Sequence, residues 1–137
     1  MRFFILALLA FHSLAIACPT LEGSYPRCTV FGDAQNFPKI SNLLVKQELL
    51  SNLTRYELKY DLDGVAQAEV FLSSGQLFQN GDRQTLSKCR GTDSLYVVHF
   101  ENSARTAVFE YARIGEHELR FMAEIIDRGY VAVSCRR

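Results

Sequence analysis

The sequence predicts an all-β fold, in which antiparallel strands follow one another as an up-and-down meander and close into a small barrel of about eight strands. Three observations support this prediction. Apolar and polar residues alternate with a period of two over most of the chain after residue 43, a pattern typical of half-buried strands. Turn-forming residues separate the alternating segments at short intervals. Four cysteines follow an apolar leader, which indicates two disulfides. A sandwich of two sheets is the alternative architecture.

The leader has the features of a secretory signal peptide. Arg2 is followed by an apolar run that ends in Ala15-Ile16-Ala17, a small-x-small cleavage site. The run is shorter than the roughly 20 residues that a membrane-spanning helix needs, and no later segment is apolar over such a length. We therefore expect residues 1–17 to be removed and residues 18–137 to form one exported domain, either periplasmic or secreted, with no transmembrane segment.

The cysteines of the mature part are Cys18, Cys28, Cys89 and Cys135. Four cysteines allow three pairings. We expect Cys18 to pair with Cys28, which closes a short N-terminal loop, and Cys89 to pair with Cys135, which ties a middle strand to the last one. A lipid anchor on Cys18, directly after the cleavage site, is a less favoured alternative because it would leave one thiol without a partner.

Residues 42–50 form the first strand expected from the alternation, although their apolar residues also fit a short helical stripe. The next segment, 54–62, alternates most clearly, with aromatic and aliphatic residues on one face and charged residues on the other. Asp63-Gly64 then favours a tight hairpin turn, after which 66–72 returns as the partner strand.

The later strands follow the same alternation between turn signals. In the strand beginning at Ser94 we assign Tyr96, Val98 and Phe100 to the interior and His99 to the outside, and in a later strand Phe121 points inward. These later strands are expected at residues 77–79, 84–89, 94–101, 106–114, 118–126 and 130–135.

Composition and motifs disfavour several classes of function. Fifteen Lys and Arg residues balance fifteen Asp and Glu residues, so no basic surface for a nucleic acid or an anionic membrane is expected. No nucleophile motif is present, and the chain is predicted not to be an enzyme. His99 and His117 lack the close-spaced partners that zinc needs, and both are expected at the surface. Neither a metal nor another cofactor is therefore predicted.

The mature N-terminus, Cys18-Pro19-Thr20-Leu21-Glu22-Gly23-Ser24-Tyr25, resembles that of a group of small, uncharacterised exported bacterial proteins that begin Cys-Pro-x-Leu-x-Gly-x-Tyr. Gly23-Ser24-Tyr25 is also similar to the Gly-x-aromatic start of the first strand in lipocalin-like barrels, although this chain has no tryptophan. The resemblance implies a lipocalin-like (calycin-like) barrel and implies no particular activity.

The interior of such a barrel is either filled by side chains or wide enough to hold a small ligand. We predict a non-enzymatic exported binding protein for a small apolar ligand, with a filled interior as the competing interpretation. The alternative is a protein–protein interaction or inhibitor module of the cell envelope, similar to lysozyme inhibitors. It is suggested by apolar residues expected on the outer faces of two strands, namely Leu95, Val97, Met122 and Ile126. The aromatic residues expected to line a ligand pocket are Tyr56, Tyr60, Tyr96, Phe100 and Phe121.

Overall fold

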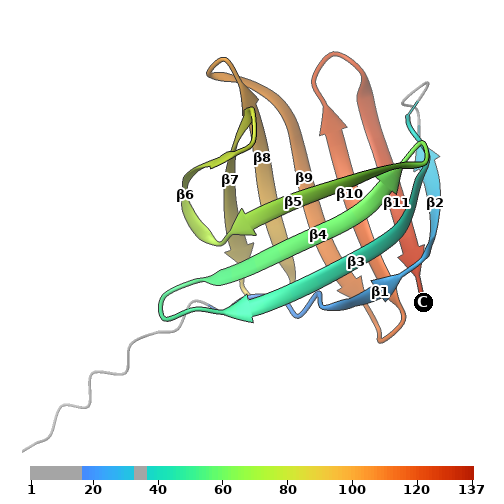
Figure 1. The fold of residues 1–137 in the computed structure, drawn as a ribbon, viewed down its shortest axis with the longest axis horizontal. Coiled ribbons are helices and arrows are strands. Elements are labelled where there is room, and N and C mark those ends of the chain that lie inside the picture. Colours follow the sequence, from blue (N-terminus) through green and yellow to red (C-terminus); the bar gives the residue numbers. More distant parts are fainter. Residues whose placement is uncertain (1–16, 33–36) are drawn as a thin grey trace, which may run out of the picture.

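Eleven strands in two antiparallel sheets make up the regular structure of the described part of the chain. The computed structural model describes residues 17–32 and 37–137, so the expected signal peptide lies outside the described residues except for Ala17. The all-β, antiparallel prediction is confirmed. The prediction of one closed barrel of about eight strands is wrong, because the strands divide between two facing sheets and neither sheet closes on itself (Figure 1).

The smaller sheet has four strands in the order β1-β3-β4-β5. Asp63 and Gly64 form the predicted tight turn between β4 and β5, with φ angles of 49° and 80°, the left-handed conformation that such turns require. The segment that also fitted a helix is a strand, β3. The bounds are β1 (Gly23–Tyr25), β3 (Ile40–Leu49), β4 (Thr54–Leu62) and β5 (Val65–Leu72).

The larger sheet has seven strands in the order β2-β11-β10-β9-β8-β7-β6. Its last six strands in sequence are the predicted meander, since each pairs with the next along the chain. The first strand, β2, was not predicted because nearly all its residues are exposed and it shows no inside-outside alternation. The bounds are β2 (Arg27–Gly32), β6 (Ser74–Asn80), β7 (Arg83–Arg90), β8 (Ser94–Glu101), β9 (Ala104–Ile114), β10 (Glu118–Ile125) and β11 (Gly129–Arg136).

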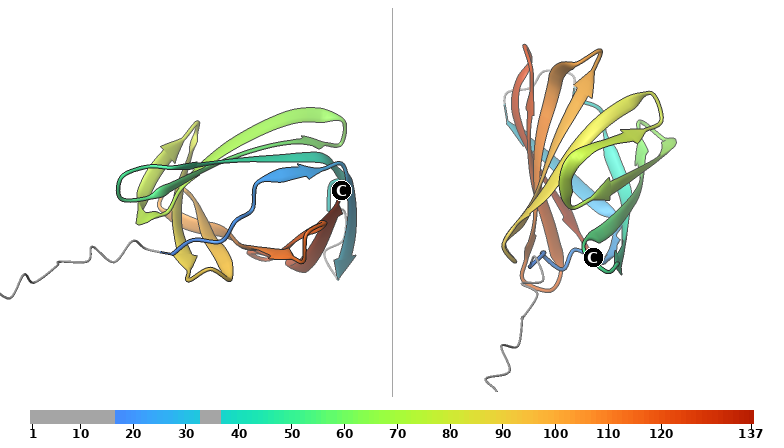
Figure 2. Two further views of the ribbon diagram at one scale, coloured as in Figure 1. Left: turned by 90° about the horizontal axis from the view of Figure 1, so that it is seen from below. Right: turned by 90° about the vertical axis from the view of Figure 1, so that its left-hand side faces the viewer.

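The chain changes sheet three times, from β1 to β2, from β2 to β3 and from β5 to β6. The connection between β2 and β3 lies partly outside the described residues, and the other two are corners of one residue each. Pro26 separates β1 from β2, and Ser73 separates β5 from β6. A backbone hydrogen bond of 3.0 Å holds each corner, from the amide of Asn42 to the Pro26 carbonyl and from the amide of Ser73 to the Thr54 carbonyl. The two sheets face each other with their strands crossing at a steep angle, and the interior lies between them (Figure 2).

The core lies between the sheets, and it corrects the predicted orientation of β8. Leu95 and Val97 are fully buried there, whereas Tyr96 is only half-buried. Both faces of this strand are apolar, so alternation alone could not identify the inner one. Pairing with β9, which places Leu95 opposite Tyr111 and Val97 opposite Phe109, decides the orientation, since directly paired residues project to the same side of a sheet.

Two disulfides are present, but both pairings differ from the prediction. Cys18 is bonded to Cys89, and Cys28 is bonded to Cys135. Cys28 on β2 lies directly opposite Cys135 on β11, with 4.0 Å between their Cα atoms. The predicted Cys18–Cys28 bond relied on short sequence spacing, and the predicted Cys89–Cys135 bond was to tie a middle strand to the last one. The fold instead places β2 and β11, the first and last strands of the large sheet along the chain, side by side. Because Cys18 is in a disulfide, its thiol is not free to carry a lipid.

Candidate ligand cavity

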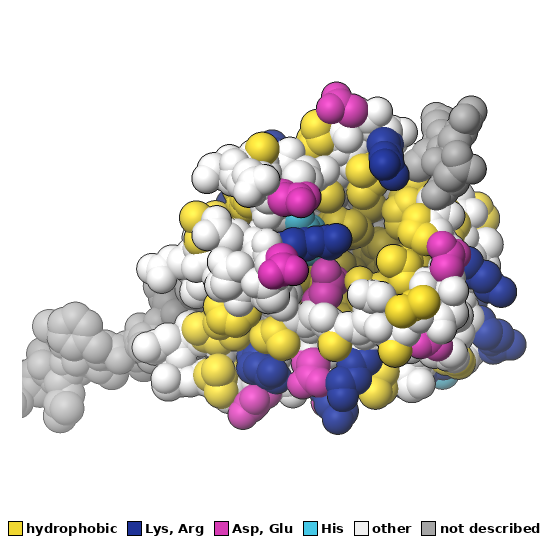
Figure 3. Space-filling model, turned by 45° about the horizontal axis from the view of Figure 1, so that its top comes forward, with side chains coloured by type: hydrophobic (Ala, Val, Ile, Leu, Met, Phe, Trp, Pro, Cys, Tyr) yellow, Lys and Arg dark blue, Asp and Glu magenta, His cyan; other side chains and the backbone are white. Residues whose placement is uncertain are grey.

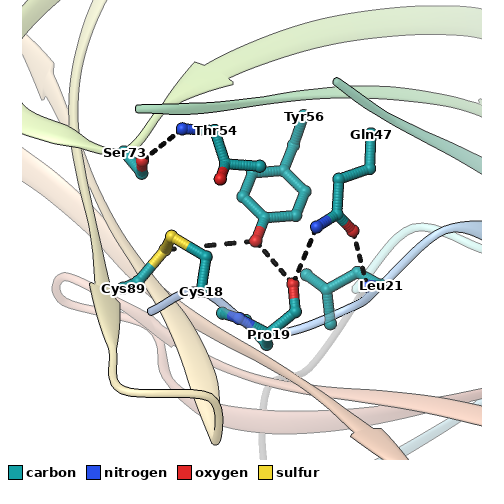
Figure 4. Close-up of a disulfide and its surroundings, with 8 residues drawn as sticks. All are labelled: Cys18, Pro19, Leu21, Gln47, Thr54, Tyr56, Ser73 and Cys89. Carbon is teal, nitrogen blue, oxygen red and sulfur yellow. Dashed lines mark hydrogen bonds between the residues drawn. A yellow bond between two sulfur atoms is a disulfide. The ribbon is translucent and has the colours of Figure 1, made fainter. Parts of the chain in front are cut away.

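One end of the interior is filled by the segment that follows Cys18. The side chains of Pro19 and Leu21 are buried in it. The Pro19 carbonyl accepts hydrogen bonds from the Tyr56 hydroxyl (2.6 Å) and from Nε2 of Gln47 (3.1 Å), and the Leu21 amide donates to Oε1 of Gln47 (2.9 Å) (Figure 4). The Gln47 side chain thus supplies the hydrogen bonds that a neighbouring strand would otherwise give to the backbone of this irregular segment.

The Cys18–Cys89 disulfide fastens the same segment to the end of β7. Tyr56 lies beside it and belongs to the fully buried core. Burial raises the pKa of Tyr56 well above its ordinary value, so its hydroxyl stays a neutral donor. Packed side chains therefore form a floor at this end of the interior.

The opposite end holds a cavity of about 480 Å³. It opens where the turns after β4, β8 and β10 lie, and Figure 3 shows this end hollowed, with hydrophobic side chains inside and charged side chains of both signs around the rim. Apolar residues form most of its wall, and a smaller number of polar and charged residues completes the lining. The lining residues are Phe37, Pro38, Ile40, Leu43, Leu58, Tyr60, Leu62, Glu69, Arg83, His99, Glu101, Thr106, Ala107, Phe109, Tyr111, Phe121, Ile125, Ile126 and Arg128.

Aromatic rings form one wall of the cavity. The ring centroids of Phe109 and Tyr111 are 6.0 Å apart and nearly parallel, and the Tyr111 and Phe121 centroids are 5.1 Å apart. The His99 ring meets Phe109 edge to face at 5.0 Å. Such a wall offers flat apolar surface to a ring-shaped molecule.

His99 is the buried polar residue of the cavity, which corrects the prediction that it lies at the surface. Its side chain is 4 % exposed, and neither ring nitrogen has a hydrogen-bond partner among the described residues. Desolvation and the positive charge of Arg83 lower the pKa of His99 from 6.5 to about 4, so the imidazole is neutral at pH 7. His117, the other histidine expected at the surface, is exposed as predicted.

The charged lining residues balance one another. Glu69 and Glu101 supply two carboxylates, and Arg83 and Arg128 supply two guanidinium groups. Burial raises the pKa of the Glu69 carboxyl, while a hydrogen bond from Tyr60 and the charge of Arg83 act in the opposite direction. The lining therefore has no formal excess of either charge to select a strongly ionic ligand.

The structure brings together only part of the predicted aromatic set. Tyr60 and Phe121 line the cavity, whereas Tyr56 lies in the filled end. Tyr96 and Phe100 were wrongly assigned to the interior, since the residues that alternate with them on β8 face inward. On the outer face, the Arg90 guanidinium lies 4.4 Å from the centroid of the Tyr96 ring.

Three central lining residues, His99, Phe109 and Tyr111, did not emerge from the sequence. The alternation in the sequence of β9 does place Phe109 and Tyr111 on one face of the strand, and this was the available sign that they belong together. It does not say which face is inside, because apolar residues also occur on the other face of that strand. His99 then follows from the register that pairs β8 with β9.

No protein-family model matches the chain, and no curated protein or solved structure shows significant similarity to it. Within residues 17–32 and 37–137, no group of three His, Cys, Asp or Glu side chains is placed to hold a metal ion. The same described residues contain no helix with the length and apolar character to cross a membrane. Function must therefore be inferred from the cavity.

Proposed function

We propose that this protein is an exported, non-enzymatic binding protein that holds a small, mainly apolar ligand between its two sheets. The observation that carries the proposal is the cavity of about 480 Å³ with its aromatic wall and open mouth. Ligand sites in proteins have volumes of roughly 300–1,000 Å³ and combine a mainly apolar lining with a few polar groups. This cavity has both properties.

The packed end of the interior around Tyr56 is compatible with a ligand site at the other end. Side chains occupy the interior around Tyr56, where the Cys18–Cys89 disulfide holds the floor. The cavity begins beyond this packed region, so the competing interpretation of an entirely filled interior applies to one end only. A wall that is rigid before the ligand arrives lowers the entropic cost of binding.

Export is part of the same proposal. The leader has the pattern of a signal peptide, and two disulfides fit an oxidising compartment. We place the protein in the periplasm or outside the cell. Expression of the full-length chain, followed by N-terminal sequencing of the exported product, tests this placement, and the expected first residue is Cys18.

Binding is tested with N-phenyl-1-naphthylamine, an uncharged dye whose fluorescence rises in apolar surroundings. We expect saturable binding of one dye molecule by the wild-type protein. Ala107→Phe, inside the cavity, should weaken binding at least tenfold because the added ring occupies ligand space. Ala112→Phe adds the same ring on the outer face of the same strand, and should bind as the wild type does. Absence of saturable binding, or equal affinity in all three proteins, would contradict the proposal.

A second candidate function is a protein–protein interaction in the cell envelope, of the lysozyme-inhibitor type. It is favoured by an exposed apolar row on the outer face of the large sheet. Phe31, Ala132 and Met122 are directly paired across β2, β11 and β10, and Phe31 and Met122 are 56 % and 57 % exposed. Surface residues of this kind often mark a contact site.

The second candidate makes a separate prediction. Wild-type protein should inhibit a lysozyme in a cell-wall lysis assay, and the double variant Phe31→Glu with Met122→Glu should inhibit it at least tenfold less. The Ala107→Phe variant, altered in the cavity, serves as the control and should inhibit normally. Failure of the wild type to inhibit lysozymes would remove this candidate without affecting the ligand proposal.

A further inference from the structure

Three buried polar side chains lie next to one another on β7 and β8. His99 lines the cavity, Thr85 is directly opposite it in the strand register, and Ser87 is two residues farther along β7. Directly paired residues project to the same side of a sheet, so all three share the inner face. Thr85 and Ser87 are each 1 % exposed.

None of these side chains has a hydrogen-bond partner within the described part of the chain. Both ring nitrogens of His99, Oγ1 of Thr85 and Oγ of Ser87 are buried without one. Buried polar atoms are almost always paired, because an unpaired one has lost its hydrogen bonds to water and gained none in return. Of the three, His99 lines the cavity, so its ring marks the place where a polar group of a ligand is received.

The chemistry of the cluster selects an uncharged group. A neutral imidazole has one donor and one acceptor nitrogen, and the hydroxyl of Thr85 can act as either donor or acceptor. A ligand carboxylate would be attracted by Arg83 and Arg128 and repelled by Glu69 and Glu101, so the charged lining residues offer it no net formal attraction. A hydroxyl, in contrast, can donate to one partner and accept from the other without burying a charge.

The aromatic wall beside the cluster selects the rest of the molecule. Phe109 contacts the His99 ring and stands in the same wall as Phe121, with 6.1 Å between the two phenylalanine ring centroids. A ring system lying against this wall would bring a hydroxyl on its edge toward His99.

We infer that the ligand is an uncharged ring-containing alcohol or phenol, whose hydroxyl is bound by His99 where this residue lines the cavity, with Thr85 directly opposite His99 on β7. This inference rests on the proposed ligand-binding function and adds the chemical class of the ligand. His99 is therefore the specificity-determining residue of the cavity and Thr85, its direct partner in the strand register, is a positioning residue. The aromatic wall supplies most of the apolar contact.

Three probes that share one ring system test the inference at pH 7. They are 2-naphthol, 2-methylnaphthalene and 2-naphthoate, each titrated as a competitor of bound N-phenyl-1-naphthylamine. The wild type should bind 2-naphthol at least tenfold more tightly than either of the other two. Removal of the polar ring in His99→Leu should abolish the preference for 2-naphthol while 2-methylnaphthalene still binds.

Two further variants make the test decisive. His117→Leu removes the exposed histidine and should leave all three affinities unchanged. Thr85→Val keeps the size of the side chain and removes only its hydroxyl, so it should reduce the preference for 2-naphthol even if His99→Leu does not fold.

The outcomes separate the inference from the function on which it rests. If neither the dye nor any naphthalene probe binds the wild type, the proposed function itself is wrong. The hydroxyl site is overturned, although the cavity still binds apolar molecules, if the wild type binds 2-methylnaphthalene as tightly as 2-naphthol. The same conclusion follows if His99→Leu and Thr85→Val both keep the preference for 2-naphthol. Tightest binding of 2-naphthoate would overturn it in favour of an anionic ligand.

Discussion

The Tyr56 hydroxyl donates a 2.6 Å hydrogen bond to the carbonyl of Pro19, a residue 37 positions earlier in the chain. The bond joins a strand of the small sheet to the segment that fills one end of the interior. Tyr56→Phe should lower the free energy of unfolding by only about 1 kcal/mol, because the Pro19 carbonyl keeps its second donor, Gln47. Urea denaturation measures the change.

Gln47→Leu should cost more than Tyr56→Phe in the same experiment. The substitution removes both the donor to Pro19 and the acceptor of the Leu21 amide, so a partly buried amide loses its partner. We expect a loss of about 2–3 kcal/mol. Tyr130→Phe, which removes a hydroxyl from a side chain that is 60 % exposed, is the control and should change stability by less than about 0.5 kcal/mol. A larger loss in Tyr56→Phe than in Gln47→Leu would contradict this account.

The disulfide pairing is tested by digesting the unreduced protein and identifying linked peptides by mass spectrometry. A Cys28–Cys135 peptide and a Cys18–Cys89 peptide are expected, and a Cys18–Cys28 peptide would show the pairing to be wrong. The bonded cysteines are 71 and 107 residues apart, so each bond should stabilise the fold by about 4–5 kcal/mol in the chain-entropy model.

Removing only the first disulfide should loosen the filled end. In the double variant Cys18→Ala with Cys89→Ala, we expect the unfolding free energy to fall by several kcal/mol and the Leu21 amide to exchange its hydrogen faster. Under conditions where the variant remains folded, hydrogen exchange at the amide of Val133, in the middle of β11, should be accelerated less. Equal acceleration at both amides would indicate loss of the whole fold instead.

The buried imidazole of His99 makes stability depend on pH. Its pKa is about 4 in the folded protein and 6.5 in the reference state. A depressed folded pKa means that the unfolded chain takes up the proton first, so stability is complete above about pH 6.5 and is lost as the pH falls toward 4. Linkage gives a loss on the order of 2 kcal/mol between pH 7 and pH 5.

Urea unfolding of the wild type and of His99→Leu at both pH values isolates this contribution. Glu69, whose pKa is raised by burial, acts in the opposite direction within the same range, and it is present in both proteins. The pH-dependent loss should therefore be smaller in His99→Leu than in the wild type by about 2 kcal/mol. An identical loss in the two proteins would show that His99 does not titrate as its burial requires.

Gly32 allows a prediction about the end of β2. Its φ is 116°, and a Cβ atom there would lie 2.8 Å from the backbone oxygen of Tyr130. Gly64 also has a positive φ, yet a Cβ atom there meets nothing within 4 Å. Gly64→Ala should cost about 1 kcal/mol from conformation alone, and Gly32→Ala should cost clearly more because a clash with backbone is added. Thermal unfolding of both variants checks the order.

Local pattern was enough to predict most strands and turns. The expected strand at 54–62 coincides with β4, and Asp63-Gly64 forms the turn that follows it. A strand with one apolar and one polar face carries this information in its own residues, because solvent and core impose the period of two directly. The short β2, exposed along nearly all its length, carries no such pattern and was not predicted.

Other features could only be decided by contacts between distant residues. Alternation in β8 could not show that His99 rather than Tyr96 faces the cavity, because both faces of the strand are apolar and the register with β9 settles the matter. Likewise, Cys28 meets Cys135 only because β2 lies beside β11.

By itself, the sequence therefore determined an all-β chain with four cysteines and the approximate positions of nine strands, and it predicts a signal peptide. Tertiary structure alone decided that the strands form two sheets, which cysteines pair and that a cavity remains at one end. The volume of the cavity depends on the distance between the two sheets and on how much of the opposite end is filled by the segment after Cys18. The physical reason is that strand formation reflects local polarity, whereas empty space reflects how distant surfaces fit together.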